Sequence, residues 1–223
     1  MRFLISIVAV TLAACSSEKP PAPAAATPAA ALPAPAPAPV EGPALSADLV
    51  ARLTRPHSPV LGAPTAKVTV VEVLDPACEA CRAFAPIVKQ LLFLYPDDVR
   101  VVVRYADFHP PSEEAIRALV AAQGQGKFDA LLNALFERQE EWASHASPDP
   151  AKIWKIAGDA GLNVGKARKD AQAARVDELL RAESEDLAAI KVERTPTFFV
   201  NGKSLPRFGP NELLALVRSE LGK

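Results

Sequence analysis

The chain has 223 residues, with 25 Lys and Arg against 26 Asp and Glu, which gives a formal net charge of -1 at pH 7. This near-neutral balance argues against a nucleic-acid-binding module, because such proteins carry a strong basic excess. Two residue types depart from an ordinary composition. The 22 prolines are about twice the average usage, and the 3 cysteines are too few for a disulfide-rich mini-protein. Their positions divide the chain into parts with different roles.

Residues 1–14 have the pattern of an export signal. Arg2 supplies a positive charge, and residues 3–14 form an apolar run too short for a membrane span, which takes about 20 helical residues. The run ends in Leu-Ala-Ala before Cys15, which resembles the lipobox of bacterial lipoproteins. The resemblance implies cleavage before Cys15, diacylation of Cys15, and anchoring in the periplasm at the outer membrane rather than the inner, because Ser16 and not Asp follows. The alternative is an ordinary secretory signal with an incidental cysteine.

Residues 15–44 are predicted to form a spacer behind this anchor. The 24 residues from Pro20 to Pro43 include nine prolines and ten alanines, and Glu41 is their single charge. Such a segment cannot bury enough apolar surface to offset the entropy of ordering. Alternating Ala and Pro favours polyproline II, so we expect a semi-stiff linker that holds a folded domain away from the membrane.

The folded domain is predicted to span residues 45–223 and to open with a βαβ unit. A first helix is expected over 47–55, followed by a loop at 57–62. Two runs rich in Val have strand length and buried character, at 68–74 and 99–105, with a helical period from Cys78 to Phe93 between them. A strand, a helix and a strand within about 40 residues predict parallel pairing of the two strands.

The rest of the domain is predicted to contain a helical insertion and a closing hairpin. Residues 112–191 carry no strand signal, and helices are expected over 112–123 and 127–143, from residue 150, and over 164–190 with or without a break. Residues 197–205 predict a hairpin that turns at Asn201-Gly202, and Pro210 opens a last helix to Leu221. The predicted fold is therefore α/β, with the order β-α-β, helical insertion, β-β-α.

With Cys15 assigned to lipid, Cys78 and Cys81 remain as a Cys-x-x-Cys motif between a buried strand and a helix. A thiol at a helix N-terminus is stabilised as a thiolate by unpaired N–H groups and the helix dipole, which lowers its pKa. Cys81 lies on the same helix face and can reach the sulfur of Cys78. We expect Cys78 to attack a substrate disulfide and Cys81 to resolve the mixed disulfide.

Other roles for the pair remain open from the residues alone. A structural disulfide is one, although so tight a loop constrains the unfolded chain little. A closed zinc site needs four ligands, and a copper site favours soft sulfur, whereas the sequence has no second cysteine pair and no methionine beyond Met1. We expect no metal and no cofactor other than the dithiol itself. A non-catalytic domain that holds unfolded clients is a further alternative, but it needs no dithiol.

Two motifs carry a resemblance to a known family. Residues 75–82 (DPACEACR) are similar to the active-site loop of bacterial DsbA-family thiol:disulfide oxidoreductases, and residues 195–202 (TPTFFVNG) to that family's cis-proline loop and hairpin. Residues 68–105 and 192–222 resemble the thioredoxin fold, and the helical insertion resembles its DsbA-like branch. The resemblance covers the whole predicted domain.

The resemblance also implies roles for residues around the cysteines. Pro196 would follow a cis bond beside the sulfurs, and Thr195 would pair with an extended substrate peptide; a plain strand-initiating proline is the alternative. The family carries a buried acid at the strand position of Glu72, so we hypothesise that Glu72 takes the proton of the second cysteine, unless it meets solvent at a strand edge. Glu79 and Ala80, expected to contact substrate, replace the Pro-His of the family's best-known oxidant. A carboxylate beside the attacking sulfur predicts a higher thiol pKa and a less oxidising pair.

We therefore expect a monomeric, extracytoplasmic thiol:disulfide oxidoreductase that acts on protein substrates and binds no nucleic acid. The resemblance implies a membrane redox partner similar to DsbB or DsbD. A reductase or isomerase kept reduced by a membrane electron donor is the alternative. His57, His109 and His145 are widely separated and are interpreted as surface residues, with His109 a candidate for the border of the active-site face.

Overall fold

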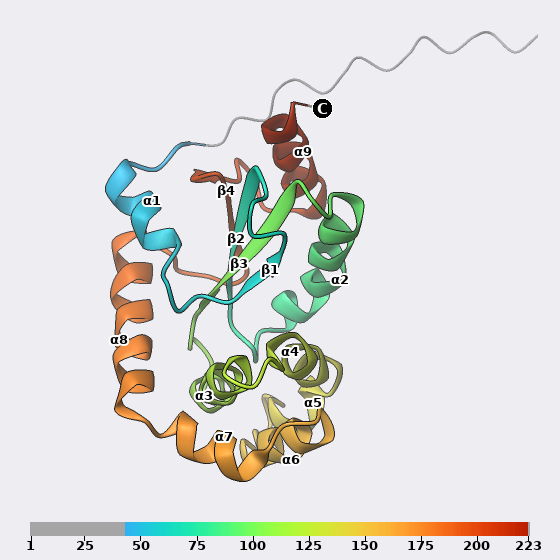
Figure 1. Ribbon diagram of the computed structural model, residues 1–223, viewed down its shortest axis with the longest axis vertical. Coiled ribbons are helices and arrows are strands. Elements are labelled where there is room, and N and C mark those ends of the chain that lie inside the picture. The colour runs from blue at the N-terminus through green and yellow to red at the C-terminus, as the bar shows by residue number, and fades with distance from the viewer. Residues whose placement is uncertain (1–42, 223) are drawn as a thin grey trace, which may run out of the picture. The chain divides into compact units, whose positions relative to one another are not determined.

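A five-stranded sheet with the strand order β1-β3-β2-β4-β5 forms the centre of the fold (Figure 1). The computed structural model describes residues 43–222, so the predicted export signal, Cys15 and nearly all of the predicted linker lie outside the described residues. The strands are β1 (Val60–Gly62), β2 (Val68–Leu74), β3 (Val99–Tyr105), β4 (Thr197–Val200) and β5 (Lys203–Ser204). The helices are α1 (Ala47–Leu53), α2 (Glu79–Leu94), α3 (Ser112–Gln123), α4 (Phe128–Glu137), α5 (Gln139–Trp142), α6 (Ala151–Asp159), α7 (Val164–Ala171), α8 (Ala174–Ala189) and α9 (Pro210–Leu221).

The two valine-rich strands lie next to each other at the middle of the sheet. β2 and β3 pair in parallel from Val68 opposite Val99 to Leu74 opposite Tyr105, and α2 connects them. Six of the seven residues in each strand are buried, as expected for strands covered on both faces. β4 pairs antiparallel with the other side of β2 and continues into β5. These pairings confirm the predicted βαβ unit and hairpin.

Helices cover both faces of the sheet. On one face, side chains of α2 and α9 pack against β2, β3 and β4, and on the other face α1 and α8 pack against the same strands. The helices α3 to α7 gather at one end of the sheet around a core of their own, which includes Leu74 and Tyr105 at the carboxyl ends of β2 and β3 (Figure 1). From β3 to β4 the described chain is helical, which confirms the predicted insertion.

Three local predictions were wrong. Residues 60–62 form β1, which pairs antiparallel with β3, and not a loop. A three-residue strand has too few residues to show a period, and Gly62 is required there because its φ is 90° and a Cβ would lie 2.7 Å from the Val99 carbonyl. The helix expected over 127–143 is interrupted at Arg138, where ψ is 22°. The first helix, expected over 47–55, ends at Leu53.

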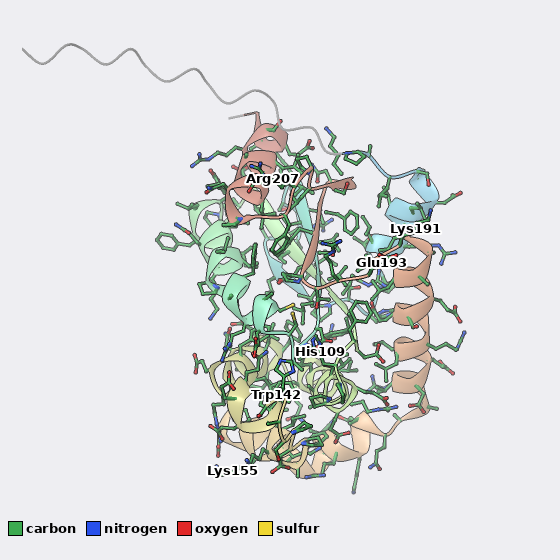
Figure 2. The ribbon with its side chains drawn as sticks, turned by 180° about the vertical axis from the view of Figure 1, so that it is seen from behind. His109, Trp142, Lys155, Lys191, Glu193 and Arg207 are labelled. Carbon is green, nitrogen blue, oxygen red and sulfur yellow. The ribbon has the colours of Figure 1, made fainter. Side chains whose placement is uncertain are left out.

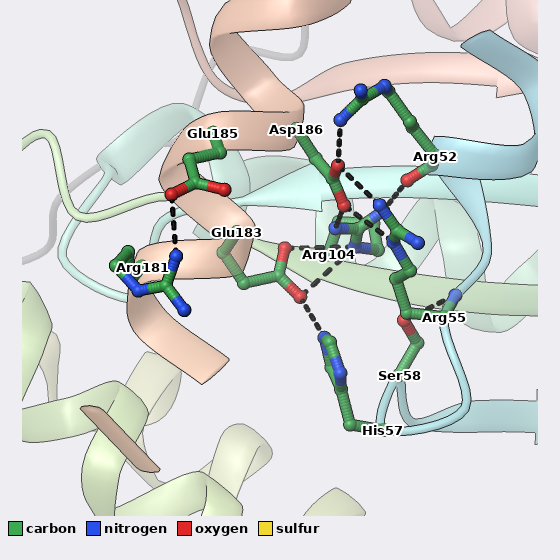
Figure 3. Close-up of polar contacts among 9 residues, drawn as sticks. All are labelled: Arg52, Arg55, His57, Ser58, Arg104, Arg181, Glu183, Glu185 and Asp186. Atoms are coloured by element: carbon green, nitrogen blue, oxygen red, sulfur yellow. Dashed lines mark hydrogen bonds and ion pairs between the residues drawn. The ribbon is translucent and has the colours of Figure 1, made fainter. Parts of the chain in front are cut away.

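A buried ion cluster attaches α8 to the sheet (Figure 3). Arg104 of β3 is fully buried, and its guanidinium donates at 2.9 Å to Glu183 and at 2.9 Å to Asp186, both on α8. The basic side chains around these two carboxylates are Arg52, Arg55, His57 and Arg104. Burial acts to raise the pKa of Asp186, but the hydrogen bonds from the three arginines outweigh it and hold that pKa far below its ordinary value. The Asp186 carboxylate therefore stays charged at neutral pH.

Replacing Arg104 by Met should destabilise the fold because Glu183 and Asp186 would remain buried with fewer positive partners. We expect a loss of about 3–5 kcal/mol in the free energy of unfolding, measured by urea denaturation at pH 7. The control is Arg181→Met, which breaks the exposed 2.8 Å pair with Glu185 on the same helix and should cost at most about 1 kcal/mol. Equal losses in the two variants would contradict the importance of burial.

Candidate active site

The loop between β2 and α2 places both cysteines at the amino end of α2. Cys78 is the N-cap residue, with extended backbone angles, and Cys81 lies in the first turn. Cys78 is 7% exposed, whereas Cys81 is completely buried, so the two sulfurs are not equivalent toward a large substrate. Neither forms a disulfide in this structure.

The thiol of Cys78 is acidic. Its pKa is lowered to about 5, chiefly by a hydrogen bond from the Cys81 thiol, and further by hydrogen bonds from the Thr195 side chain and from the backbone N–H groups of Cys81 and Ala80. Burial acts in the opposite direction and is the weaker influence. The backbone donors are N–H groups that have no partner within the helix, as the sequence predicts for a thiol in this position.

Cys81 has the opposite character. Burial raises the pKa of its thiol far above the ordinary value, and the neighbouring Cys78 raises it further. The backbone N–H of Asp75 donates to the Cys81 sulfur over 3.5 Å and only partly offsets these effects. At neutral pH the pair therefore consists of one thiolate, on Cys78, and one thiol, on Cys81.

The loop before β4 lies against the sulfur of Cys78. The peptide bond between Thr195 and Pro196 is cis, which confirms that expectation. The Cys78 sulfur lies 3.4 Å from the Thr195 carbonyl oxygen, to which Cys78 donates a hydrogen bond when it is in the thiol form. Two loops that are more than 110 residues apart in the chain therefore meet at the reactive sulfur. The expected contact of Thr195 with a substrate peptide stays a prediction.

Glu72 lies below the cysteines on the face of β2 that α2 covers. Its side chain lies on the same face of β2 as those of Val68 and Val70, is 4% exposed, and makes no hydrogen bond within residues 43–222. β2 is a central strand, so the edge position considered as an alternative is wrong. Burial raises the pKa of Glu72 to about 8, and the charge of Glu72 in turn raises the pKa of Cys81.

A cavity of about 430 Å³ opens beside the Glu72 carboxyl. It lies between α2, α4 and the sheet, with a mainly apolar lining and Lys89, Asp129 and Asn133 among its polar residues. Burial of the carboxyl beside these apolar side chains is the cause of its raised pKa. A proton on Glu72 is thus stable at neutral pH.

Glu79 and Ala80 are exposed beside Cys78. The Glu79 carboxylate lies 3.5 Å from Nε2 of His145 and is 58% exposed. It is not among the groups that shift the pKa of Cys78. Both residues are accessible to a substrate, and their contact with one remains a prediction.

Asp75 was not anticipated as a functional residue. Its buried carboxylate accepts hydrogen bonds from the backbone N–H groups of Ala77 and Phe108 at 2.8 and 2.7 Å, and it contacts Nδ1 of His109 at 2.8 Å and the Ser112 hydroxyl. Asp75 thus connects the cysteine loop to the segment that precedes α3. His109, labelled in Figure 2, borders the site, as considered, but is only about one-third exposed. The one sequence signal for Asp75 was its place between a buried strand and the motif.

Gln139 was also missed. It is 2% exposed at the start of α5, and its amide group donates to the carbonyl of Pro76 at 2.9 Å and to the carbonyl of Cys78 at 3.1 Å. A polar residue inside an amphipathic helical pattern carries no signal for such a contact.

Within residues 43–222 no three His, Cys, Asp or Glu side chains are arranged to hold a metal ion. In the same part of the chain no helix has the length and apolar character of a membrane span.

Comparison with known proteins gives the family. The family model described as thioredoxin matches residues 54–218. A sodium/proton antiporter NhaA 1 from Mycobacterium sp. (strain KMS) is 30% identical in an alignment of 178 residues that covers 75% of this chain and 27% of the antiporter. The chain thus spans only about a quarter of the length of that curated relative.

Solved structures share the fold over most of the chain. A thioredoxin-like oxidoreductase from Silicibacter pomeroyi DSS-3 is 27% identical, with a TM-score of 0.67 over 80% of this chain and 99% of that one. The α-DsbA1 protein of Wolbachia pipientis is 15% identical, with a TM-score of 0.66 over 76% of this chain and 93% of that one. With its cysteine pair at the start of α2 and a cis-proline loop against it, the chain belongs to the thioredoxin family and has the fold of its DsbA-like members.

Proposed function

We propose that the chain is a thiol:disulfide oxidoreductase that exchanges disulfides with protein substrates through Cys78 and Cys81. The observation that carries this proposal is the contrast between the two thiols. Cys78 has a pKa lowered to about 5 and some exposure, whereas Cys81 is buried and has a strongly raised pKa. A structural pair needs no such contrast, but an attacking and a resolving cysteine do.

The reaction begins with the Cys78 thiolate. It attacks one sulfur of a substrate disulfide, so that a bond from Cys78 to that sulfur forms while the substrate disulfide breaks, and the departing substrate sulfur takes a proton. Cys81 then loses its proton and attacks the sulfur of Cys78. The products are a Cys78–Cys81 disulfide and a second substrate thiol, so two electrons pass from the pair to the substrate. Substrate oxidation is the same sequence in reverse, and no resident cofactor is needed.

Glu72 is the proposed proton acceptor for Cys81. It shares the face of β2 under α2, its charge is felt at Cys81, and its pKa of about 8 lets it hold or release a proton near neutral pH. Pro196 has no N–H that could compete for the thiolate, and the neighbouring Thr195 backbone is proposed to bind the substrate peptide. Glu79 and Ala80 form the exposed side of the same site.

The acidity of Cys78 supports a pair of intermediate oxidising strength. Its pKa of about 5 lies between about 3.5 for the strong oxidant DsbA and about 7 for thioredoxin. A more stable thiolate stabilises the reduced pair and makes the disulfide a stronger oxidant. We favour oxidation of substrate thiols. A measured reduction potential of the Cys78/Cys81 pair would distinguish this direction from reduction or isomerisation of substrate disulfides.

The proposed location is the periplasm, with a lipid on Cys15 and a spacer over residues 15–44. The support is the signal-like run at residues 1–14 and the proline-rich composition that follows it. A pair that turns over must be reoxidised or rereduced, so a membrane redox partner similar to DsbB or DsbD is part of the proposal.

Cysteine replacement tests the activity. In a dithiothreitol-driven insulin reduction assay, Cys78→Ser should lose essentially all catalysis because it removes the attacking sulfur. Cys81→Ser retains that sulfur and, when the reduced variant is incubated with insulin without dithiothreitol, should accumulate a mixed disulfide that mass spectrometry detects. A client-holding domain without redox activity would instead keep insulin soluble equally well in both variants and in the unaltered protein, which would refute the proposed enzyme.

The pH dependence of alkylation tests the acidity of Cys78. Because its pKa is lowered to about 5, the thiolate is present above that pH and is lost as the pH falls through it. The rate of modification by iodoacetamide should therefore rise between about pH 4 and 6 and stay nearly constant to pH 8. A rate that continues to rise tenfold per unit through pH 8 would show an ordinary thiol.

Glu72→Gln should have two effects. The mixed disulfide with substrate should resolve more slowly, measured by stopped-flow fluorescence, because Cys81 loses its proton acceptor. The folded-state pKa of about 8 lies above the unfolded value, so the stability that neutral Glu72 gives is present at acid pH and lost as the pH rises toward 8. The variant should therefore be more stable than the unaltered protein at pH 8, by on the order of 3 kcal/mol.

The exposed Glu137→Gln on α4 is the control and should change neither quantity. Resolution at an unchanged rate in Glu72→Gln would remove Glu72 from the mechanism.

A further inference from the structure

A side chain from the helical insertion reaches the backbone of the cysteine loop. Gln139 is the first residue of α5, and its Nε2 donates one hydrogen bond to the Pro76 carbonyl (2.9 Å) and one to the Cys78 carbonyl (3.1 Å). The Cys78 carbonyl also accepts the first backbone hydrogen bond of α2, from the N–H of Arg82 at 3.1 Å. Gln139 therefore contacts the residue that carries the reactive sulfur at the point where α2 begins.

The amide of Gln139 has one sensible orientation. Both of its partners are carbonyl oxygens, so the NH₂ group must face them. The other end of the amide, Oε1, is buried and has no hydrogen-bond partner within residues 43–222. A buried acceptor without a partner is unfavourable, and such groups are rare in folded proteins. The two donated hydrogen bonds are therefore the polar contacts that hold the Gln139 amide in place.

The helix that carries Gln139 is itself fixed. Trp142, at the other end of α5 (Figure 2), is fully buried and donates from Nε1 to the Leu135 carbonyl at 2.9 Å. The N–H of Ala143 donates to the Gln139 carbonyl at 2.8 Å. Gln139 is thus a rigid extension of the insertion and not a flexible surface residue.

We propose that Gln139 is a positioning residue of the redox centre, through which the helical insertion holds the 76–78 loop and keeps Cys78 at the amino end of α2. This role refines the proposed function. It rests on the proposed function only for the claim that the positioned sulfur reacts with a substrate. Gln139 touches no substrate and acts through the backbone. The Asp75 carboxylate accepts a hydrogen bond from the N–H of Ala77, so the loop is held both by an acceptor and by the double donor of Gln139.

The contact affects the sulfur in two ways. The NH₂ group places the positive end of a dipole beside the Cys78 carbonyl, and its loss leaves the Pro76 carbonyl without this donor and the Cys78 carbonyl with the N–H of Arg82 alone. It also fixes the loop whose geometry directs the N–H groups of Ala80 and Cys81 at the sulfur. Both effects favour the thiolate, so removing the amide must make the thiolate harder to form.

The test is Gln139→Met, which keeps the length of the side chain and removes both donors. The thiolate absorbance of the reduced protein should titrate about one pH unit higher, and alkylation of Cys78 at a pH below the midpoint should slow about tenfold. The Cys78/Cys81 pair should also become more oxidised in a fixed glutathione buffer, because a less stable thiolate disfavours the reduced form. Gln139→Glu, which keeps the shape and exchanges donors for acceptors, should shift the titration in the same direction and serves if the Met variant does not fold.

Trp154→Phe on α6 is the matched control. It removes the hydrogen bond that another buried side chain of the insertion donates to Glu114, and it leaves α5 and the cysteine loop intact. It should lower the melting temperature and leave the thiolate titration unchanged. An unchanged titration in both Gln139 variants, or an equal shift in Trp154→Phe, overturns the inference. These readouts need no protein substrate, so an unaltered protein that fails to reduce insulin would refute the proposed function and leave this result intact.

Discussion

The N–H groups at the amino end of α2 are the constraint on which the site depends. The first turn of any helix has donors without intrahelical acceptors, and here two of them point at the Cys78 sulfur. Their position follows from the βαβ unit. β2 and β3 are parallel, so α2 must begin where β2 ends and return along the sheet. A thiol placed in the connection between them is therefore beside a helix N-terminus, and its acidity is a consequence of topology as well as of local sequence.

The same geometry separates the two sulfurs. Cys81 is one turn into α2 and faces the sheet, where burial keeps its proton in place. The period of two in β2 directs Glu72 to that same covered face, beside a mainly apolar cavity. Burial thus raises the pKa of both groups. It keeps Cys81 a thiol, and it brings the pKa of Glu72 to about 8, near neutrality, as the proposed proton transfer between them needs.

The sequence predicts this framework because the signals are local. The runs of valine at 68–74 and 99–105, the position of Cys78 at a helix start and the Asn201-Gly202 turn each depend on neighbouring residues alone. Asn201 and Gly202 do adopt left-handed φ values of 47° and 80°. β1 could not be predicted because its three residues become a strand only by pairing with β3. The roles of Asp75 and Gln139 could not be predicted for a related reason. Their buried side chains bond to residues that lie 33 to 63 positions away in the sequence.

Those buried polar contacts also determine how the insertion is related to the rest of the fold. α8 is tied to β3 by Arg104 with Glu183 and Asp186, and α5 is tied to the cysteine loop by Gln139. Apolar contacts tolerate sliding, but a buried ion pair or a paired carbonyl does not, because any displacement leaves a charge or dipole without a partner. The insertion therefore cannot shift independently of the sheet. In the proposed function, a substrate that contacts the insertion next to Cys78 would act on the loop that carries the sulfur, and the helices that enlarge the thioredoxin fold would take part in the proposed disulfide exchange.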